Sequence, residues 1–368
     1  MIRNYTFPLQ ARVGNLPIDF MTFTEFQLRL RTLCAVSFSA LIAVYGAHAQ
    51  DKVLNLYSAR HYSTDEALYT NFTKATGIKI NRLEGGEDQL LQRIKSEGAN
   101  SPADVFLTVD AGRLWLADQE GVFAPVQSKV LNERIPAAYR LASNTWYGLS
   151  SRARVMVVDK LKVKPGEITS YEDLADPKWK GQVCTRSGSH VYMLSLISSI
   201  IEHAGAEKAE AWAKGVVANL ARQPKGGDTD QVKAVAAGEC AVALSNSYYL
   251  ARMIKSDKAD DRTAMERVRV VWPNTNGRGV HMNVSGGGVL KYAPNRDNAI
   301  KFMEYLVSDE AQGYFANGNN EWPIVPSLKV KNAALESMGT FKPDPINMIA
   351  LGKNQRLAQE IVNRVGWK

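Results

Sequence analysis

The 368-residue chain is 45% hydrophobic and 22% charged, with 27 glycines and 14 prolines. This composition is typical of a globular chain of about two domains and excludes disordered, collagen-like and coiled-coil proteins. Basic residues exceed acidic ones by a net charge of +8, but they are spread along the sequence. We therefore expect no nucleic-acid partner, and no apolar run is long enough to span a membrane.

The first 49 residues resemble a signal peptide rather than part of a fold. Basic residues precede the apolar stretch 33–45, and Ala47-His48-Ala49 then has the small-x-small pattern of a cleavage site. We expect the mature chain to begin at Gln50, and Met21 is an alternative start of the signal. The predicted protein is soluble, exported and periplasmic.

Cysteine usage agrees with export. Only Cys184 and Cys240 remain after the signal peptide, and an even pair in an oxidising compartment predicts a disulfide. The alternative is two buried free thiols. A zinc site would need more cysteine and histidine ligands than two isolated cysteines provide.

The start of the mature chain alternates between strand and helix patterns. Residues 63–66 (STDE) have the pattern of a capping box, which predicts a helix that ends at Gly77. Around this helix we expect strands at 53–57, 78–83 and 103–108 and a second helix at 88–97. Such a βαβαβ order is typical of an open parallel sheet.

A second unit of the same kind follows. Its expected strands are 155–158, 181–185 and 241–244, and its expected helix is 191–202. We predict an α/β fold of two lobes, each an open, mostly parallel sheet flanked by helices, with crossings at 148–155 and near 277–284. Ligands of open α/β sheets bind beyond the carboxyl ends of the strands, so the lobes would face each other across a ligand cleft.

Four tyrosines and one histidine stand at the expected strand ends and helix starts. His61 and Tyr62 follow the first strand, Tyr192 lies near a helix start, and Tyr248 and Tyr249 follow a later strand. Tyr192 faces away from the apolar stripe of its helix. We expect these five side chains to meet in the cleft.

Phenolate oxygens are hard, anionic ligands that suit ferric iron better than copper(I) or zinc. Ionising a phenol at neutral pH costs roughly 4 kcal/mol per ligand, and a trivalent cation offsets this cost. Three phenolates would neutralise Fe³⁺, and a fourth would leave the site with one negative charge. Iron binding should release protons and weaken as the pH falls.

Several motifs resemble those of the bacterial periplasmic ferric-ion-binding proteins. They are residues 57–62, 101–106, 146–150, 245–249 and 294–295, and the similarity covers essentially all of the mature chain. The resemblance implies a type II solute-binding fold that closes on one Fe³⁺ and delivers it to an inner-membrane ABC permease.

The resemblance also implies a set of metal ligands. Tyr248 and Tyr249 match the ligand pair, and Tyr192 matches the third tyrosine of the tyrosine-rich branch. His61 and Tyr62 match the variable ligands, and His61 has the alternative role of capping a backbone carbonyl.

One position departs from another branch of this family. Where that branch has an acidic ligand, this chain has Val109, and Asp110 stands one place along. Strand alternation turns Asp110 to the opposite face, so we do not expect it to be a ligand. The sequence therefore favours a site dominated by tyrosines and completed by carbonate or water.

Two groups of residues are candidates for holding such an anion. Arg152 is the first candidate and Arg154 the second, because a guanidinium group can donate paired hydrogen bonds to a planar carbonate. Ser187 and Ser189, before a helix start, form a second candidate cradle.

We expect a monomeric binding protein that is not an enzyme. The predicted N-terminal lobe comprises residues 50–152 and 279–329, and the C-terminal lobe comprises 153–278 and 330–368. One alternative is a solute-binding protein for another small anion or metal complex. A second is an exported enzyme that uses tyrosine and histidine for proton transfer, although no familiar catalytic motif is found.

Overall fold

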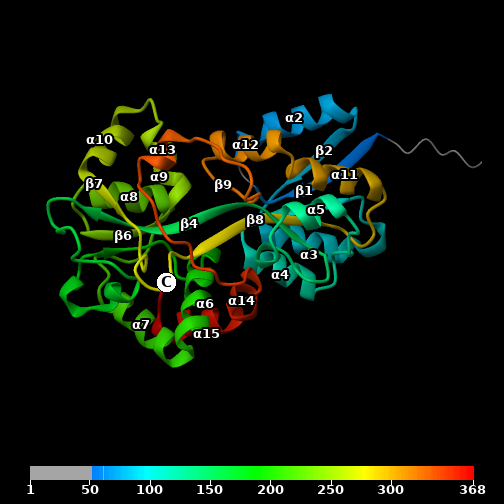
Figure 1. Cartoon of the computed structure of the whole chain (residues 1–368). Coiled ribbons are helices and arrows are strands. Elements are labelled where there is room, and N and C mark those ends of the chain that lie inside the picture. Colours follow the sequence, from blue (N-terminus) through cyan, green and yellow to red (C-terminus); the bar gives the residue numbers. More distant parts are fainter. Residues whose placement is uncertain (1–51, 61) are drawn as a thin grey trace, which may run out of the picture. The chain divides into compact units, whose positions relative to one another are not determined.

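The computed structural model describes residues 52–60 and 62–368, so the predicted signal peptide, Gln50 and His61 lie outside the described residues. Strands and helices alternate along this part of the chain (Figure 1). The described strands are β1 (Val53–Ser58), β2 (Lys79–Glu84), β3 (Val105–Thr108), β4 (Tyr147–Asp159), β5 (Val183–Cys184), β6 (Val242–Asn246), β7 (Val268–Val271), β8 (Met282–Val289) and β9 (Trp322–Pro323).

Helices flank these strands along the whole described chain. The α-helices are α2 (Asp65–Thr76), α3 (Glu87–Glu97), α4 (Ala111–Gln119), α5 (Lys129–Arg134), α6 (Val191–Ala204), α7 (Ala206–Ala218), α8 (Asp228–Ala236), α9 (Ser247–Ile254), α10 (Ala259–Arg267), α11 (Arg296–Leu306), α12 (Asp309–Asn317), α13 (Ala333–Glu336), α14 (Met348–Lys353) and α15 (Gln355–Val365). Short 3-10 helices are η1 (Gly98–Asn100), η2 (Ala137–Tyr139), η3 (Glu172–Ala175) and η4 (Pro177–Trp179). None of the described helices is both long and apolar enough to cross a membrane.

The strands pair in the order β2-β1-β3-β8-β4-β6-β5, and β7 and β9 also pair with β4. Pairing is parallel between β1 and β2, between β1 and β3, and between β5 and β6. The pairs that involve β4 or β8 are antiparallel. The α/β class is therefore confirmed, but the sheets are mixed rather than mostly parallel, because the two long crossing strands run against their neighbours.

Strand β4 carries the chain between the two halves of the fold, as expected for residues 148–155. Its first part pairs with β8, up to Ala153 opposite Met282, and its last part pairs with β6 from Arg154 opposite Asn246. The two strands lie side by side across the middle of the described chain (Figure 1). The second expected crossing is also present, although β8 begins only at Met282.

The glycine run in β8 allows its neighbours to approach closely. A Cβ atom on Gly286 would lie 2.3 Å from the carbonyl oxygen of Tyr147, and one on Gly287 would lie 2.6 Å from that of Phe106. Any larger residue at these positions would push β4 or β3 out of register.

The predicted capping box at the start of α2 is wrong. The helix begins at Asp65, and Thr64 has helical dihedrals without a capping hydrogen bond from its side chain. Its hydroxyl instead bonds Asn319. The predicted end is confirmed, because Gly77 adopts the left-handed conformation and its amide bonds Thr73.

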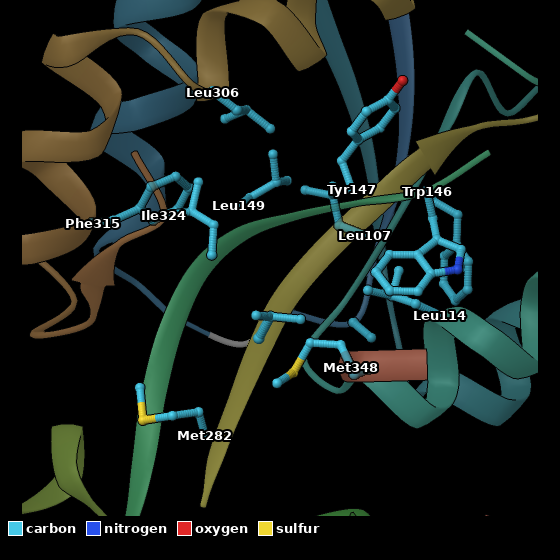
Figure 2. Close-up of a cluster of buried hydrophobic side chains, with 14 of the residues drawn as sticks. Leu107, Leu114, Trp146, Tyr147, Leu149, Met282, Leu306, Phe315, Ile324 and Met348 are labelled. Carbon is cyan, nitrogen blue, oxygen red and sulfur yellow. The ribbon is translucent and has the colours of Figure 1, made fainter. Parts of the chain in front are cut away.

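The main core surrounds the crossing strands. Figure 2 shows Tyr147 and Leu149 of β4 in a cluster with Leu306, Phe315 and Met348, which come from three helices. These side chains are at most 1% exposed. The crossing strands are therefore fixed by apolar packing, which makes them a stable base for the residues at their edges.

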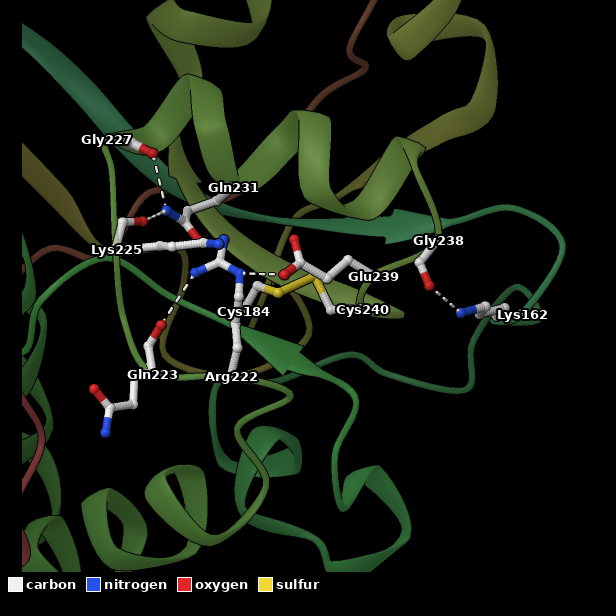
Figure 3. The surroundings of a disulfide bond; sticks show 10 residues. All are labelled: Lys162, Cys184, Arg222, Gln223, Lys225, Gly227, Gln231, Gly238, Glu239 and Cys240. Carbon is white, nitrogen blue, oxygen red and sulfur yellow. Dashed lines mark hydrogen bonds and ion pairs between the residues drawn. A yellow bond between two sulfur atoms is a disulfide. The ribbon is translucent and has the colours of Figure 1, made fainter.

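The predicted disulfide between Cys184 and Cys240 is confirmed. It ties β5 to the segment between α8 and β6, and both cysteines are fully buried. Figure 3 shows that Arg222 pairs with Glu239 beside it. The bridge closes a segment of 56 residues that includes α6, α7 and α8.

Candidate metal centre

The structure brings the four predicted tyrosines together. Tyr62, Tyr192 and Tyr248 are buried in one small cluster, and Tyr249 packs against it. We call these four residues the tyrosine cluster. Val109 and Val191 complete its apolar wall. His61, the fifth predicted ligand, lies outside the described residues.

The distances within the tyrosine cluster are short. The hydroxyls of Tyr192 and Tyr248 are 3.2 Å apart. The ring of Tyr62 meets that of Tyr248 edge-on, with centroids 5.7 Å apart. Tyr248 and Tyr249 lie with centroids 4.2 Å apart, so these neighbours in sequence lean toward each other. The four rings therefore belong to one small region, in which the hydroxyls of Tyr192 and Tyr248 lie within hydrogen-bond distance.

Each tyrosine is placed by a strand end or a helix start. Tyr62 follows β1, Tyr192 lies in the first turn of α6, and Tyr248 lies in the first turn of α9. His190 caps α6, because its Nδ1 accepts a hydrogen bond from the Tyr192 amide at 3.2 Å. Helix N-termini carry a partial positive charge, which favours an anion such as a phenolate.

Guanidinium groups surround the tyrosine cluster. Arg60 lies 4.7 Å from the ring centroid of Tyr62, and Arg152 lies 5.5 Å from that of Tyr192. Arg186, at 5.2 Å from the Tyr192 ring, and the exposed Arg252 near Tyr249 were not predicted from the sequence. Their positive charges favour negative charge on the phenols.

Arg152 and Arg154 have different surroundings although both are 1% exposed. Arg154 donates to Asp228 at 2.6 Å and to Asn246 at 3.0 Å, so its charge is already paired. Arg152 donates to Ser285 at 3.0 Å, and its Nε and Nη2 have no hydrogen-bond partner among the described residues. Arg154 keeps one such donor, its Nε, so Arg152 has more donors left for an anion.

Ser187 and Ser189, the second predicted anion site, form hydrogen bonds with other residues. The carbonyl of Ser187 accepts a hydrogen bond from the His190 amide. Ser189 is exposed, and its hydroxyl accepts from Gln359 of α15 at 3.0 Å. This contact joins Ser189 to α15 rather than to the tyrosine cluster.

A buried acid behind the site has no signal in the sequence. Glu321 is fully buried and accepts from Ser150 at 2.8 Å and from Arg60 at 3.4 Å. Its other oxygen accepts from Ser285, the residue that also binds Arg152. An isolated glutamate in a loop usually reads as a surface residue, so sequence reasoning missed it.

Burial favours the neutral, protonated form of three tyrosines of the cluster. Burial raises the pKa of Tyr62 well above its usual value, and the charge of Glu321 adds to this effect. Burial likewise raises the pKa of Tyr192 and of Tyr248, while the charge of Arg152 opposes the rise. Only a strongly charged cation would displace these protons.

A cavity of about 510 Å³ opens beside Tyr192. Its walls include Arg60, Val109 and His190, together with the glycines that precede α3. Asp110, next to Val109, is buried, and its side chain caps α4 by accepting from the Gly112 amide. The tyrosine cluster thus has an adjoining cavity at Tyr192.

Known proteins have sequences similar to that of this chain. A family profile for bacterial extracellular solute-binding proteins matches residues 100–342. "Iron uptake protein A1" of Synechocystis is 48% identical over 92% of this chain and 94% of its own length. The "Fe(3+)-binding periplasmic protein" of Serratia marcescens is 28% identical over 80% of this chain and 86% of its own.

Solved structures agree in fold. Trichodesmium IdiA (FutA), in complex with iron and citrate ligands, is 54% identical with a TM-score of 0.82, over 86% of this chain and all of the other. The ferric binding protein of Campylobacter jejuni has 38% identity and a TM-score of 0.82 over the same shares. Both confirm the predicted two-lobed type II binding fold. The chain belongs to the bacterial extracellular solute-binding protein family.

Proposed function

We propose that this chain is a periplasmic solute-binding protein that captures Fe³⁺ through the phenolate oxygens of Tyr62, Tyr192, Tyr248 and Tyr249. One observation carries the proposal: these side chains, far apart in sequence, converge until the Tyr192 and Tyr248 hydroxyls are 3.2 Å apart. Phenolates are hard anionic ligands; three of them balance the charge of a trivalent ion, and a fourth leaves the site with one negative charge. The names of the similar proteins, an iron uptake protein and a Fe(3+)-binding periplasmic protein, support the same cargo.

The predicted fifth ligand and the anion remain part of the proposal. His61 precedes Tyr62 directly, and its imidazole would complete the ligand set. Arg152 would hold a carbonate beside the metal through its unpartnered Nε and Nη2 groups. Arg154 is the second candidate donor: Asp228 holds its Nη1, and its Nε has no hydrogen-bond partner among the described residues.

Lobe closure around the ion would precede its delivery to an inner-membrane ABC permease. We assign residues 50–152 and 279–329 to one lobe and 153–278 and 330–368 to the other, with β4 and β8 as the connections. Tyr62 belongs to the first lobe and the other three tyrosines to the second. A monomer, exported after cleavage near Ala49, would suffice for this role.

The decisive experiment is a titration of the purified protein with ferric citrate at neutral pH, followed by visible absorption. Coordination of phenolate to iron produces an intense charge-transfer band and an orange to red colour. Replacing Tyr248 or Tyr249 with Phe should weaken or abolish the band while the fold is retained. A colourless wild-type protein would refute the proposal.

A further inference from the structure

We infer that Asp110 is a positioning residue that fixes helix α6, and with it Tyr192, against the end of β3; the inference rests on the proposed function. Asp110 is fully buried. Both of its carboxylate oxygens accept from the hydroxyl of Ser195, at 3.0 and 2.8 Å. Ser195 lies on α6, three residues after Tyr192.

The same carboxylate connects four separate elements. It accepts from the Gly112 amide of α4 at 2.8 Å and from Asn283 of β8 at 2.7 Å, and Gln355 of α15 lies 3.5 Å away. A helix cap needs only the first of these bonds. The remaining partners come from distant parts of the chain, so the carboxylate holds α6 as well as capping α4.

The geometry of α6 links Ser195 to the tyrosine cluster. Residues three apart lie on the same face of a helix, about 4.5 Å apart along its axis. A change in height or rotation of α6 at Ser195 therefore moves Tyr192, whose hydroxyl is 3.2 Å from that of Tyr248. A phenol ligand displaced by a fraction of an ångström loses its bond length to the metal.

The neighbour of Asp110 acts on the other side of the same strand end. Val109 packs within the tyrosine cluster, whereas the carboxylate of Asp110 accepts a hydrogen bond from Ser195 of α6. Two adjacent residues thus shape one wall of the site, one by contact and one through the helix. Asp110 touches no tyrosine of the cluster through any described hydrogen bond, so its effect on iron passes through Ser195.

The test compares two substitutions on one helix. Ser195→Ala removes the bond to Asp110 and leaves the cap of α4 intact. Ser198→Ala is the matched control, because Ser198 is equally buried on α6 and its hydroxyl has no hydrogen-bond partner among the described residues. Ferric affinity is measured by competition with citrate, the phenolate–iron band by visible absorption, and the fold by thermal melting.

We expect Ser195→Ala to lower ferric affinity about tenfold, as for the loss of a hydrogen bond to a charged group, and to shift the charge-transfer band. Ser198→Ala should keep the wild-type affinity and band. Asp110→Asn should shift the band in the same direction as Ser195→Ala. A purely structural role would lower the melting temperature without moving the band.

Two results would overturn the inference. One is a wild-type band and affinity in Ser195→Ala; the other is an equal loss in Ser198→Ala. In either case a coloured wild-type protein leaves the proposed iron function standing. If the wild type itself forms no band with ferric citrate, the proposed function and the inference both fail.

Discussion

The ring of Tyr62 meets the ring of Tyr248 at 88°, edge against face, across the boundary that we assign between the lobes. Tyr62 follows β1, whereas Tyr248 opens α9 after β6, at the other end of the sheet path. An edge-to-face contact between the rings stabilises this arrangement, and a phenylalanine at position 62 would keep it. Removing the Tyr62 hydroxyl while keeping its ring therefore tests the role of that hydroxyl in metal binding.

Replacing Tyr62 with Phe should separate metal binding from folding. The ring contact with Tyr248 is kept, so the melting temperature should change little. Ferric affinity should fall by at least about 100-fold, beyond the effect typical of residues outside the first coordination sphere. Isothermal titration or citrate competition would measure the loss.

Tyr305→Phe is the matched control for this change. The buried hydroxyl of Tyr305 has no hydrogen-bond partner among the described residues, and it lies on α11, outside the tyrosine cluster. Its variant should bind iron as the wild type does. Equal affinity in the Tyr62 and Tyr305 variants would remove Tyr62 from the ligand set.

Iron binding should weaken steeply as the pH falls. Burial raises the pKa of Tyr62, Tyr192 and Tyr248, so these phenols are protonated in the metal-free protein throughout the neutral range. Each phenol that binds Fe³⁺ must release its proton, and apparent affinity should fall about tenfold per released proton for each unit of pH.

The number of released protons is directly measurable. The unbuffered protein is titrated with a ferric chelate whose own proton uptake is known, and the pH is followed with an electrode. We expect three or four protons to be released per iron bound. Release of one proton or none would mean that neutral groups bind the cargo.

Arg152→Gln tests the proposed anion. The unpartnered Nε and Nη2 of Arg152 would hold carbonate, so wild-type ferric affinity should drop when bicarbonate is removed from the buffer. In the variant, affinity should be low with or without bicarbonate. Arg269→Gln, on β7, removes one positive charge elsewhere and should retain the bicarbonate effect. Bicarbonate independence of the wild type would contradict an anion role.

Much of the fold was predictable because its local signals are strong. The strand starting at Val53, the helix end at Gly77 and the start of α6 at Val191 follow from apolar periodicity and glycine. Tyrosines at strand ends were predictable for the same reason, since open α/β sheets gather such positions at one edge.

The missed features depend on contacts between distant residues. Most of β4 was not predicted, because Arg152 and Arg154 interrupt its apolar pattern. Both arginines are buried in the folded chain, where Arg152 donates a hydrogen bond to Ser285 and Arg154 donates one to Asp228. Glu321 gives no periodic signal at all. Tertiary pairing decides such positions, and a single sequence does not display it.

The disulfide should contribute to stability without contributing to the metal site. Replacing Cys184 and Cys240 together with Ala removes a bridge that spans 56 residues, which is worth roughly 4 kcal/mol in the chain-entropy treatment. Urea unfolding of the metal-free protein would measure the loss. The phenolate–iron band should be unchanged, and a lost band would show that the bridge also positions α6.

The buried carboxylate of Asp228 should be essential for stability because two cations depend on it. Asp228 accepts from Arg154 at 2.6 Å and from Arg186 at 3.1 Å. Although burial opposes ionisation, these arginines hold the pKa of Asp228 below its usual value. Its contribution to stability is therefore present above about pH 4 and is lost as the pH falls further.

Asp228→Asn should destabilise the protein by about 3–5 kcal/mol at neutral pH, because Arg154 would keep a buried charge without its partner. Asp309→Asn is the matched control, since Asp309 pairs with Arg134 at the surface and its side chain is 71% exposed. That variant should lose less than about 1 kcal/mol. Urea unfolding of both variants would measure the two losses of stability. Equal losses would mean that Arg154 finds another partner or water, so that its ion pair with Asp228 does not anchor β4 behind the tyrosine cluster.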